Sequence, residues 1–485
     1  MNRPNIIYQK SVSGRTGYTL PQTKKSQDEI LSAIPEKFRR TTDAPLPEIA
    51  ENEVMRHFVG LSIKNHHIDK GFYPLGSCTM KYNPKLNDKA AGFKGFSAHH
   101  PLAPNELSAG SLHLMHELSK DLCEVSGLDA VTLQPAAGAH GEFTGLQIMR
   151  AYHLKNGDTK RNKIIIPDSA HGTNPATVTA VGFKTVQVKS NEHGVIPPEA
   201  VAAVMDDEVV GMMMTNPNTL GIFETHIKEI AKIIHDGGGL MYMDGANLNA
   251  NMGIFRPGDV GFDIMHFNLH KTFSTPHGGG GPGSGAVGVT KELEKFLPFP
   301  VLEKNADGTI TFNYDRPDSI GRVHSYFGNF GVLVRAFAYI RSLGGEGLKE
   351  VSENAVLNAN YLKEILKEYY DLPYDVTCMH EFVLSGNRQK KVGVKTLDIS
   401  KRLLDFGVHS PTNYFPLIVP EAMMIEPTET ESRETLDYFA DVMKQIAKEA
   451  IEDKEMVTTA PHNTIVRRLD EVGAVRNGDV AYLDV

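Results

Sequence analysis

The sequence predicts an α/β protein with a large domain on a parallel or mixed sheet and a smaller C-terminal α+β domain. Two observations support this prediction. Between about residues 163 and 290, short apolar runs alternate with helix-like stretches, as in a parallel sheet whose strands are joined by helices. After a glycine-rich tract at 277–285 the composition shifts, and strand-like and helix-like segments of a second domain follow.

The apolar runs are the expected strands of the large sheet. They are apolar at nearly every position, as strands covered on both faces are. In such sheets, ligands bind at the carboxyl ends of the strands. The runs are KIIIP (163–167), KTVQV (184–188), EVVGMMMTN (208–216), GLMYMDG (239–245) and DIMHFN (263–268).

Three regions follow from these patterns. Residues 1–65 are polar and irregular and predict an extended arm or packing segment, and residues 66–328 form the large domain. Residues 329–485 hold linking helices and the small domain. The segments expected there are a helix pair at 329–370 broken at Leu343-Gly344-Gly345, strand-like stretches at 374–384 and 412–417, and helices near 397–406 and 432–450.

Composition excludes several classes of protein. The 485 residues are 41% hydrophobic and 22% charged, and no run approaches the roughly 18 apolar residues of a membrane span. Fifty basic against fifty-nine acidic residues, without a basic stripe, argue against nucleic acid. Three widely spaced cysteines argue against a disulfide framework or a cysteine zinc site. The N-terminus lacks the features of a secretory signal, so the cytoplasm or an organelle matrix is the default expectation, and the cytoplasm is the predicted location.

The sharpest candidate site consists of Asp244, which ends one apolar run, and Lys271, which follows the next. An unpaired buried ammonium is costly. A Schiff base removes that cost, and an aspartate at a neighbouring strand end can keep a pyridinium nitrogen protonated. The pair therefore indicates a pyridoxal phosphate site, although a salt bridge at the sheet edge fits these two residues equally well.

Two further segments favour the cofactor. Ala136, Ala137 and Gly138 lead directly into a helix and offer backbone N–H groups to a phosphate, although an ordinary flexible cap has the same pattern. His171 lies just beyond the run KIIIP, where its ring could stack on a flat cofactor or serve a structural role.

Six segments in this order resemble the P-protein of the glycine cleavage system. They are GFYPLGSCTMKYNP, QPAAGAHGE, PDSAHGTNPA, MYMDGANLNA, HFNLHKTFSTPHGGGGPGSG and HNTIVRRLDEV. The resemblance runs from about Tyr73 to Leu469. It corresponds to the C-terminal half of the single-chain enzyme, and so to subunit 2 of the split, two-subunit form.

The resemblance implies a fold-type-I pyridoxal phosphate enzyme, similar to aspartate aminotransferase. Lys271 matches the Schiff-base lysine, Asp244 the partner of the pyridinium nitrogen and His171 the ring-stacking histidine. The phosphate-binding turn corresponds to Ala137 and Gly138. His270, beside the lysine, is a candidate contact for phosphate or substrate.

The implied reaction is decarboxylation of glycine, with release of carbon dioxide and transfer of the aminomethyl group to the lipoyl group of an H-protein. A homologous subunit 1 is the implied partner, two of each chain together. Two alternatives stay open. One is a pyridoxal phosphate decarboxylase of a larger amino acid, and the other is a non-catalytic scaffold subunit, which Lys271 and Asp244 make hard to justify.

Other motifs are ambiguous or excluded. Cys78 and Lys81 are expected near the active site, or else as a buried thiol and a surface lysine. The tract 277–285 is either a mobile loop or a tight backbone crossing, since glycine permits both. Gly283, Gly285 and Gly288 have G-x-G-x-x-G spacing, but they lie at a strand-like stretch instead of following a strand and opening a helix, so no dinucleotide site is predicted. No metal site is expected at His113 and His116.

Overall fold

The structure is a computed structural model that describes residues 6–42, 44–100 and 103–478. It divides into two compact units, one made of Met1–His67 with Pro461–Val485 and the other of Ile68–Ala460. Within the described residues, no helix combines the length and the apolar character that crossing a bilayer requires.

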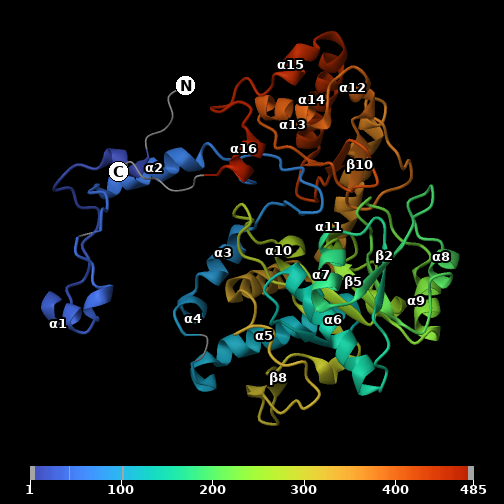
Figure 1. The fold of residues 1–485 in the computed structure, drawn as a ribbon, viewed down its shortest axis with the longest axis horizontal. Helices are drawn as coiled ribbons and strands as arrows, with labels where there is room; N and C mark the ends of the chain where they lie inside the picture. The colour runs from blue at the N-terminus through green and yellow to red at the C-terminus, as the bar shows by residue number, and fades with distance from the viewer. Residues whose placement is uncertain (1–5, 43, 101–102, 479–485) are drawn as a thin grey trace. The chain divides into compact units, whose positions relative to one another are not determined.

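The larger unit is built on a seven-stranded mixed sheet with the order β1-β7-β6-β5-β4-β2-β3 (Figure 1). Strand β7 runs antiparallel to both of its neighbours, and the other pairs are parallel. The strands are β1 (Ala130–Thr132), β2 (Lys163–Pro167), β3 (Lys184–Val188), β4 (Val209–Thr215), β5 (Leu240–Gly245), β6 (Ile264–Phe267) and β7 (Val287–Val289).

The five predicted strands are confirmed, with one difference in burial. Strands β4, β5 and β6 are buried along their whole length, as the continuous apolar runs require. Strand β3 is not covered on both faces, because it is the edge of the sheet and Lys184, Thr185 and Gln187 are exposed. Polar residues on an edge strand oppose pairing with another chain.

Helices cover both faces of this sheet, because alternate residues of each strand point to opposite sides. Met212 and Met214 pack on one face with residues of α5, α9 and α11, whereas Met213 packs on the other face with residues of α6 and α7. These helices are α5 (Asn105–Ser126), α6 (Gly138–Lys155), α7 (Thr173–Val181), α9 (Ile227–Asp236) and α11 (Phe330–Leu366).

The long helix α11 leads from the large sheet to the small domain and carries the predicted break. Gly344 leaves helical geometry with φ 65° and ψ −175°, a backbone conformation that glycine adopts without a steric penalty. The helix pair expected at 329–370 is therefore confirmed.

The small domain holds a three-stranded antiparallel sheet with the order β10-β12-β11. Its elements are β10 (Phe382–Ser385), β11 (Thr412–Asn413), β12 (Ala422–Ile425), α13 (Thr396–Leu403) and α14 (Arg433–Glu452). A segment from far upstream extends this sheet, since Leu75 forms a bridge with Ile425 and the amide of Gly76 donates to the carbonyl of Met424 at 3.3 Å.

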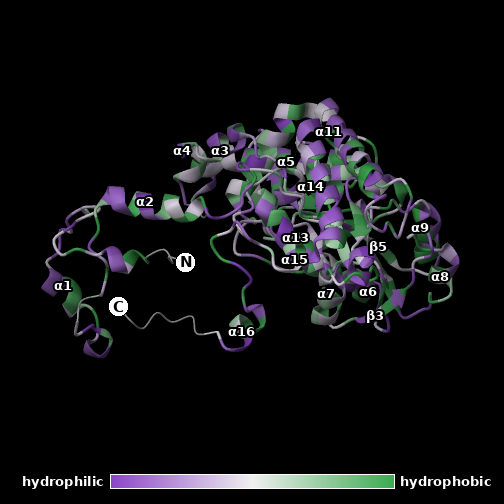
Figure 2. Ribbon diagram, turned by 90° about the horizontal axis from the view of Figure 1, so that it is seen from above, coloured by the Kyte–Doolittle hydropathy of each residue, from purple (hydrophilic) through white to green (hydrophobic). Residues whose placement is uncertain are grey.

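The smaller unit contains more helix than its polar sequence predicts. Its helices are α1 (Gln27–Ser32), α2 (Glu51–Ser62) and α16 (Glu471–Arg476). The expectation of an irregular first 65 residues is wrong for α2, whose apolar residues, including Met55, Phe58 and Val59, recur at helical spacing. Figure 2 shows hydrophilic and hydrophobic residues side by side along α2.

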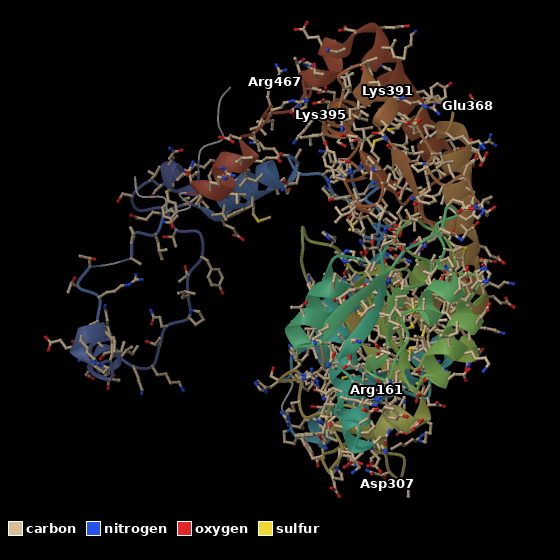
Figure 3. All side chains as sticks on the ribbon, turned by 45° about the vertical axis from the view of Figure 1, so that its right-hand side comes forward. Arg161, Asp307, Glu368, Lys391, Lys395 and Arg467 are labelled. Atoms are coloured by element: carbon tan, nitrogen blue, oxygen red, sulfur yellow. The ribbon has the colours of Figure 1, made fainter. Side chains whose placement is uncertain are left out.

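The remaining short elements connect these parts. The helices are α3 (Lys85–Ala91), α4 (Lys94–Ser97), α8 (Pro198–Ala202), α10 (Leu269–Thr272), α12 (Asn387–Lys391) and α15 (Lys454–Thr458), and β8 (Val301–Lys304) and β9 (Ile310–Asn313) form a hairpin. Exposed charged side chains cover the larger unit, such as Asp307, Glu368 and Lys391 in Figure 3.

Candidate active site

Asp244 lies at the carboxyl end of β5, buried below the edge where the sheet is expected to bind ligands. Three groups contact its carboxylate. Asn174 Nδ2 donates to Oδ2 at 3.0 Å, the amide of Ala246 donates to Oδ1 at 2.9 Å, and His266 Nε2 lies 3.2 Å from Oδ1. Burial alone would raise the pKa of Asp244, but His266 and the two hydrogen bonds outweigh it and hold the pKa far below its ordinary value. Asp244 is therefore a charged carboxylate.

His266 connects Asp244 to the interior of the sheet. Its Nδ1 lies 2.8 Å from the hydroxyl of Tyr242, which is fully buried two residues before Asp244 on the same strand. The sequence prediction missed His266, although a histidine inside the apolar run DIMHFN is a detectable signal, since a buried polar side chain needs a partner.

Lys271 lies in α10, immediately after β6, the strand that pairs with β5. The structure thus brings Lys271 and Asp244 to the ends of adjacent strands. The Lys271 amine donates to the carbonyl of Ser77 at 2.8 Å. Ser77 belongs to the GSCTMK segment, which therefore lies at the lysine, as expected.

His171 and α7 follow the carboxyl end of β2. His171 Nδ1 lies 2.9 Å from the hydroxyl of Thr173, and that hydroxyl donates to Glu142 of α6 at 2.7 Å. The His171 ring packs edge-on against Phe415, with the centroids 5.4 Å apart. Burial lowers the pKa of His171, so the ring is neutral at neutral pH and an apolar stacking surface.

Helix α6 begins at Gly138, and among the described residues no side chain caps its N-terminus. Its first backbone N–H groups therefore remain available to an anion. The turn is tightly enclosed by the chain after β6. A Cβ on Gly138 would lie 2.5 Å from Asn268 Oδ1, and a Cβ on Gly285 would overlap the carbonyl oxygen of Ala137.

The glycine-rich tract combines both structures that its sequence permits. At Gly285 it is a tight crossing over Ala137, whereas Gly279 and Gly280 are exposed, have positive φ and have open space around them.

His270 faces this tract. Its Nδ1 accepts a hydrogen bond from the amide of Ser284 at 3.2 Å. Burial, assisted by the charge of Lys271, lowers the pKa of His270 to about 4. Nδ1 also lies 3.3 Å from the Ser284 carbonyl oxygen, to which a protonated ring would donate, but burial outweighs that contact.

Lys81 is buried, so the alternative of a surface lysine is wrong. Its amine donates to Asn249 Oδ1 at 2.7 Å, to the Tyr339 hydroxyl at 3.0 Å and to Glu429 Oε1 at 2.9 Å. This satisfied network fixes the chain next to the lysine-binding Ser77. Cys78 lies within that segment, and burial raises the pKa of its thiol to about 11, so it is an unreactive thiol.

These residues fit pyridoxal phosphate. A lysine and a charged carboxylate at the ends of adjacent strands suit the aldehyde and the pyridine nitrogen. The uncapped helix start, enclosed so closely that only glycine fits at two positions, suits a phosphate. Lys271, Asp244, Gly138 and Ala137 would hold the group, and His171 lies on the segment whose Asn174 contacts Asp244.

Sequence comparison assigns most of the chain to known families. Residues 22–314 match the glycine cleavage system P-protein family, and residues 351–468 match the glycine dehydrogenase C-terminal domain family. Two similar curated proteins are each described as a probable glycine dehydrogenase (decarboxylating) subunit 2. The one from Bacillus velezensis is 59% identical over 477 residues, 98% of this chain and 97% of that protein. The one from Caldanaerobacter subterraneus subsp. tengcongensis is 58% identical over 473 residues, with the same coverage.

Solved structures agree on the fold. A crystal structure of glycine decarboxylase (P-protein) of the glycine cleavage system, in inhibitor-bound form, matches with a TM-score of 0.73 at 21% identity, covering 89% of this chain and all of that one. A cysteine desulfurase from Thermococcus onnurineus NA1 matches with a TM-score of 0.60 at 16% identity, covering 78% and 95%. The predicted pyridoxal phosphate fold type I is confirmed. With a family match over more than half of its length and close relatives along nearly all of it, the chain belongs to the glycine cleavage system P-protein family.

Proposed function

We propose that this chain is subunit 2 of a glycine dehydrogenase (decarboxylating) that uses pyridoxal phosphate to release carbon dioxide from glycine. The observation that carries the proposal is the position of Lys271 and the charged Asp244 at adjacent strand ends, in a chain 59% identical to a relative described by that activity. The aminomethyl group passes to the lipoyl group of an H-protein.

Each residue has a role that its contacts support. Lys271 would hold the cofactor covalently through its amine. Asp244 keeps the ring nitrogen protonated, and His266 with Asn174 keeps Asp244 charged and oriented. His171 stacks on the ring, the amides at Ala137 and Gly138 bind the phosphate, and His270 orients the glycine-rich tract. When bound, pyridoxal phosphate supplies an electron-accepting ring for the bonding electrons of the lost carboxylate.

The proposal includes partners and location. A homologous subunit 1 completes the enzyme, two of each chain together, and the description of the relatives as a subunit 2 supports such a partner. The lipoyl group arrives on a separate H-protein, and the complex works in the cytoplasm. We assign residues 1–65 to a packing arm, 66–328 to the cofactor domain and 329–485 to the linking helices and small domain.

A direct experiment tests this function. The chain is co-expressed with a candidate subunit 1, and exchange of labelled bicarbonate into the carboxylate of glycine is measured with lipoylated H-protein. We expect exchange with glycine and not with larger amino acids. Exchange with a larger amino acid alone would assign the chain to another decarboxylase, and no exchange with any amino acid, although cofactor is bound, would leave it as a scaffold.

A further inference from the structure

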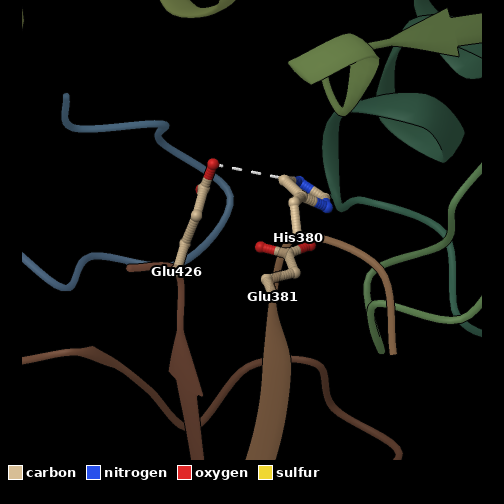
Figure 4. Close-up of side chains that lie close together, drawn as sticks. All are labelled: His380, Glu381 and Glu426. Atoms are coloured by element: carbon tan, nitrogen blue, oxygen red, sulfur yellow. Dashed lines mark ion pairs between the residues drawn. The ribbon is translucent and has the colours of Figure 1, made fainter. Parts of the chain in front are cut away.

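Two glutamates and a histidine meet in the interior of the small domain beside the active-site loop (Figure 4). Glu381 immediately precedes β10 and Glu426 immediately follows β12. These strands pair antiparallel with Phe382 opposite Ile425, which brings the two glutamates side by side. Both glutamates and His380 have 0% of their surface exposed.

Each glutamate holds one backbone amide of the loop that binds Lys271. The amide of Ser77 donates to Glu381 Oε2 at 2.7 Å, and the amide of Thr79 donates to Glu426 Oε2 at 2.8 Å. Ser77 has φ 64° and Thr79 has φ 48°, a conformation that residues with a side chain adopt at a cost. The two carboxyl groups therefore shape the turn that presents the Ser77 carbonyl to Lys271.

The outer side of the cluster is unsatisfied. Among the described residues, both ring nitrogens of His380 and Oε1 of Glu426 lack a hydrogen-bond partner. His380 Nε2 lies 3.8 Å from that oxygen. Atoms of the two carboxyl groups and the imidazole lie within 4.8 Å of one another. Two carboxylates this close and this buried do not both ionise unless a positive charge compensates them.

Lys271 is the nearby cation. Burial and mutual repulsion raise the pKa of Glu381 well above its ordinary value, burial raises that of Glu426 to about 6, and the charge of Lys271 opposes both shifts. Burial lowers the pKa of His380 to about 3, so its imidazole is neutral. Of the other groups that face the pair, Cys78 is a neutral thiol and Glu429 is already bound by Lys81.

We propose that Glu381 and Glu426 together hold one proton and take up a second when the Lys271 ammonium becomes a neutral amine. The step balances, since the ammonium and a carboxylate become an amine and a carboxylic acid. The proton returns when the amine is protonated again. This inference rests on the proposed role of Lys271 as the reacting amine and adds the group that stores its proton.

A divalent metal ion is the competing occupant. Its ligands would be the two carboxylates and the imidazole, whose ligand atoms lie within 4.8 Å of one another. The charge of Lys271 near the two carboxyl groups opposes a bound cation.

Infrared spectroscopy of the cofactor-free full chain tests the proposal without any turnover. We expect a protonated carboxyl band at pH 7 that disappears in Glu381→Gln or Glu426→Gln. In Lys271→Met the titration midpoint of that band should rise by about one pH unit or more, because the compensating charge is lost. Glu224→Gln is the matched control, since Glu224 is also buried and accepts a backbone hydrogen bond, from Ile196 at 2.7 Å, and its loss should leave this band and its shift unchanged.

Calorimetry in buffers of different ionisation enthalpy gives a second measurement. Binding of pyridoxal phosphate to the wild-type chain should release about one proton fewer per site to the buffer than binding to Glu426→Gln.

An absent carboxyl band, or a midpoint that Lys271→Met does not move, would overturn the proposal. One tightly held divalent ion per wild-type chain, lost in His380→Asn, would overturn it in favour of a metal site. Failure to bind the cofactor would count against the proposed function, while the infrared result would still decide the proton store.

Discussion

Lys271 is the residue on which the proposed chemistry depends. It follows β6, the strand that pairs with β5 and its charged Asp244, and its amine donates to the backbone carbonyl of Ser77. We predict that borohydride reduction of the cofactor-loaded protein, followed by peptide mapping, labels the segment NLHKTF at residues 268–273. Lys81 is a poor nucleophile because its amine is held by a salt bridge and hydrogen bonds. Label on Lys81 in place of Lys271 would contradict this assignment.

Asp244→Asn should keep the cofactor and lose most of the activity. An amide cannot stabilise a protonated ring nitrogen by charge, and a hydrogen bond to a charged group contributes about 1.5–3 kcal/mol, or roughly 10- to 100-fold in rate. Glycine–bicarbonate exchange and the visible absorbance of the bound cofactor measure the two properties separately. Near-normal exchange in the variant would mean that another group protonates the ring.

His270 predicts a pH dependence of stability. Its pKa in the folded protein, about 4, lies below the unfolded value near 6.5. The unfolded chain therefore binds the proton first, so the contribution of His270 is complete above pH 6.5 and is lost as the pH falls toward 4. Between pH 7.5 and 5.5 this loss is about 1 kcal/mol. Urea denaturation of the cofactor-free protein at the two pH values measures the free energy of unfolding. On acidification this free energy should fall by about 1 kcal/mol less in His270→Asn than in wild type. An equal fall in both proteins would exclude His270 as the titrating group.

The sequence predicts the residues proposed to contact the cofactor better than it predicts the residues that position them. Asp244 and Lys271 were predictable because each charged residue ends an apolar run. Glu381 and Glu426 were not, since they belong to two strands far from the lysine in sequence and only the pairing of β10 with β12 brings them to it. The roles assigned to Lys271, Asp244, His171, Ala137, Gly138 and His270 stay predictions.

At the scale of elements, the buried strands of the large sheet were predictable and β12 of the small domain was not. The runs of β4 and β5 have strong apolar character along their whole length. The four residues of β12 give too weak a pattern to be distinguished from a buried helical turn. The helix break at Gly344 was predictable because glycine interrupts a helical pattern.

The start of α6 provides a test of how an element forms the site. Gly285→Ala should destabilise the protein by about 1–3 kcal/mol, because its Cβ would overlap the Ala137 carbonyl. It should also weaken cofactor binding, since that carbonyl belongs to the proposed phosphate turn. Gly110→Ala in α5 is the control, because nothing lies within 4 Å of its Cβ. Urea denaturation and cofactor titration measure both effects, and similar values for the two variants would show that the crossing is not tight.

At the scale of the whole molecule, the chain should be inactive or nearly so until subunit 1 joins it. Helix α2 exposes more than half of the surfaces of Met55 and Phe58, and exposed apolar groups of this kind favour association. We expect the isolated chain to self-associate on size-exclusion chromatography and the partner to restore both a defined complex and exchange activity. A single chain that decarboxylates glycine at a rate unaffected by the partner would contradict the two-subunit proposal.

The bonds from Ser77 to Glu381 and from Thr79 to Glu426 also bear on how the protein is made. They join residues 304 and 347 positions apart. A ribosome adding about 5–20 residues per second needs roughly 20–70 s to cover that distance. During this interval the lysine-binding turn has no carboxylates to hold its left-handed residues. The nascent chain therefore cannot complete its cofactor site before Glu426 has emerged, and loading of the cofactor should follow the synthesis of most of the chain.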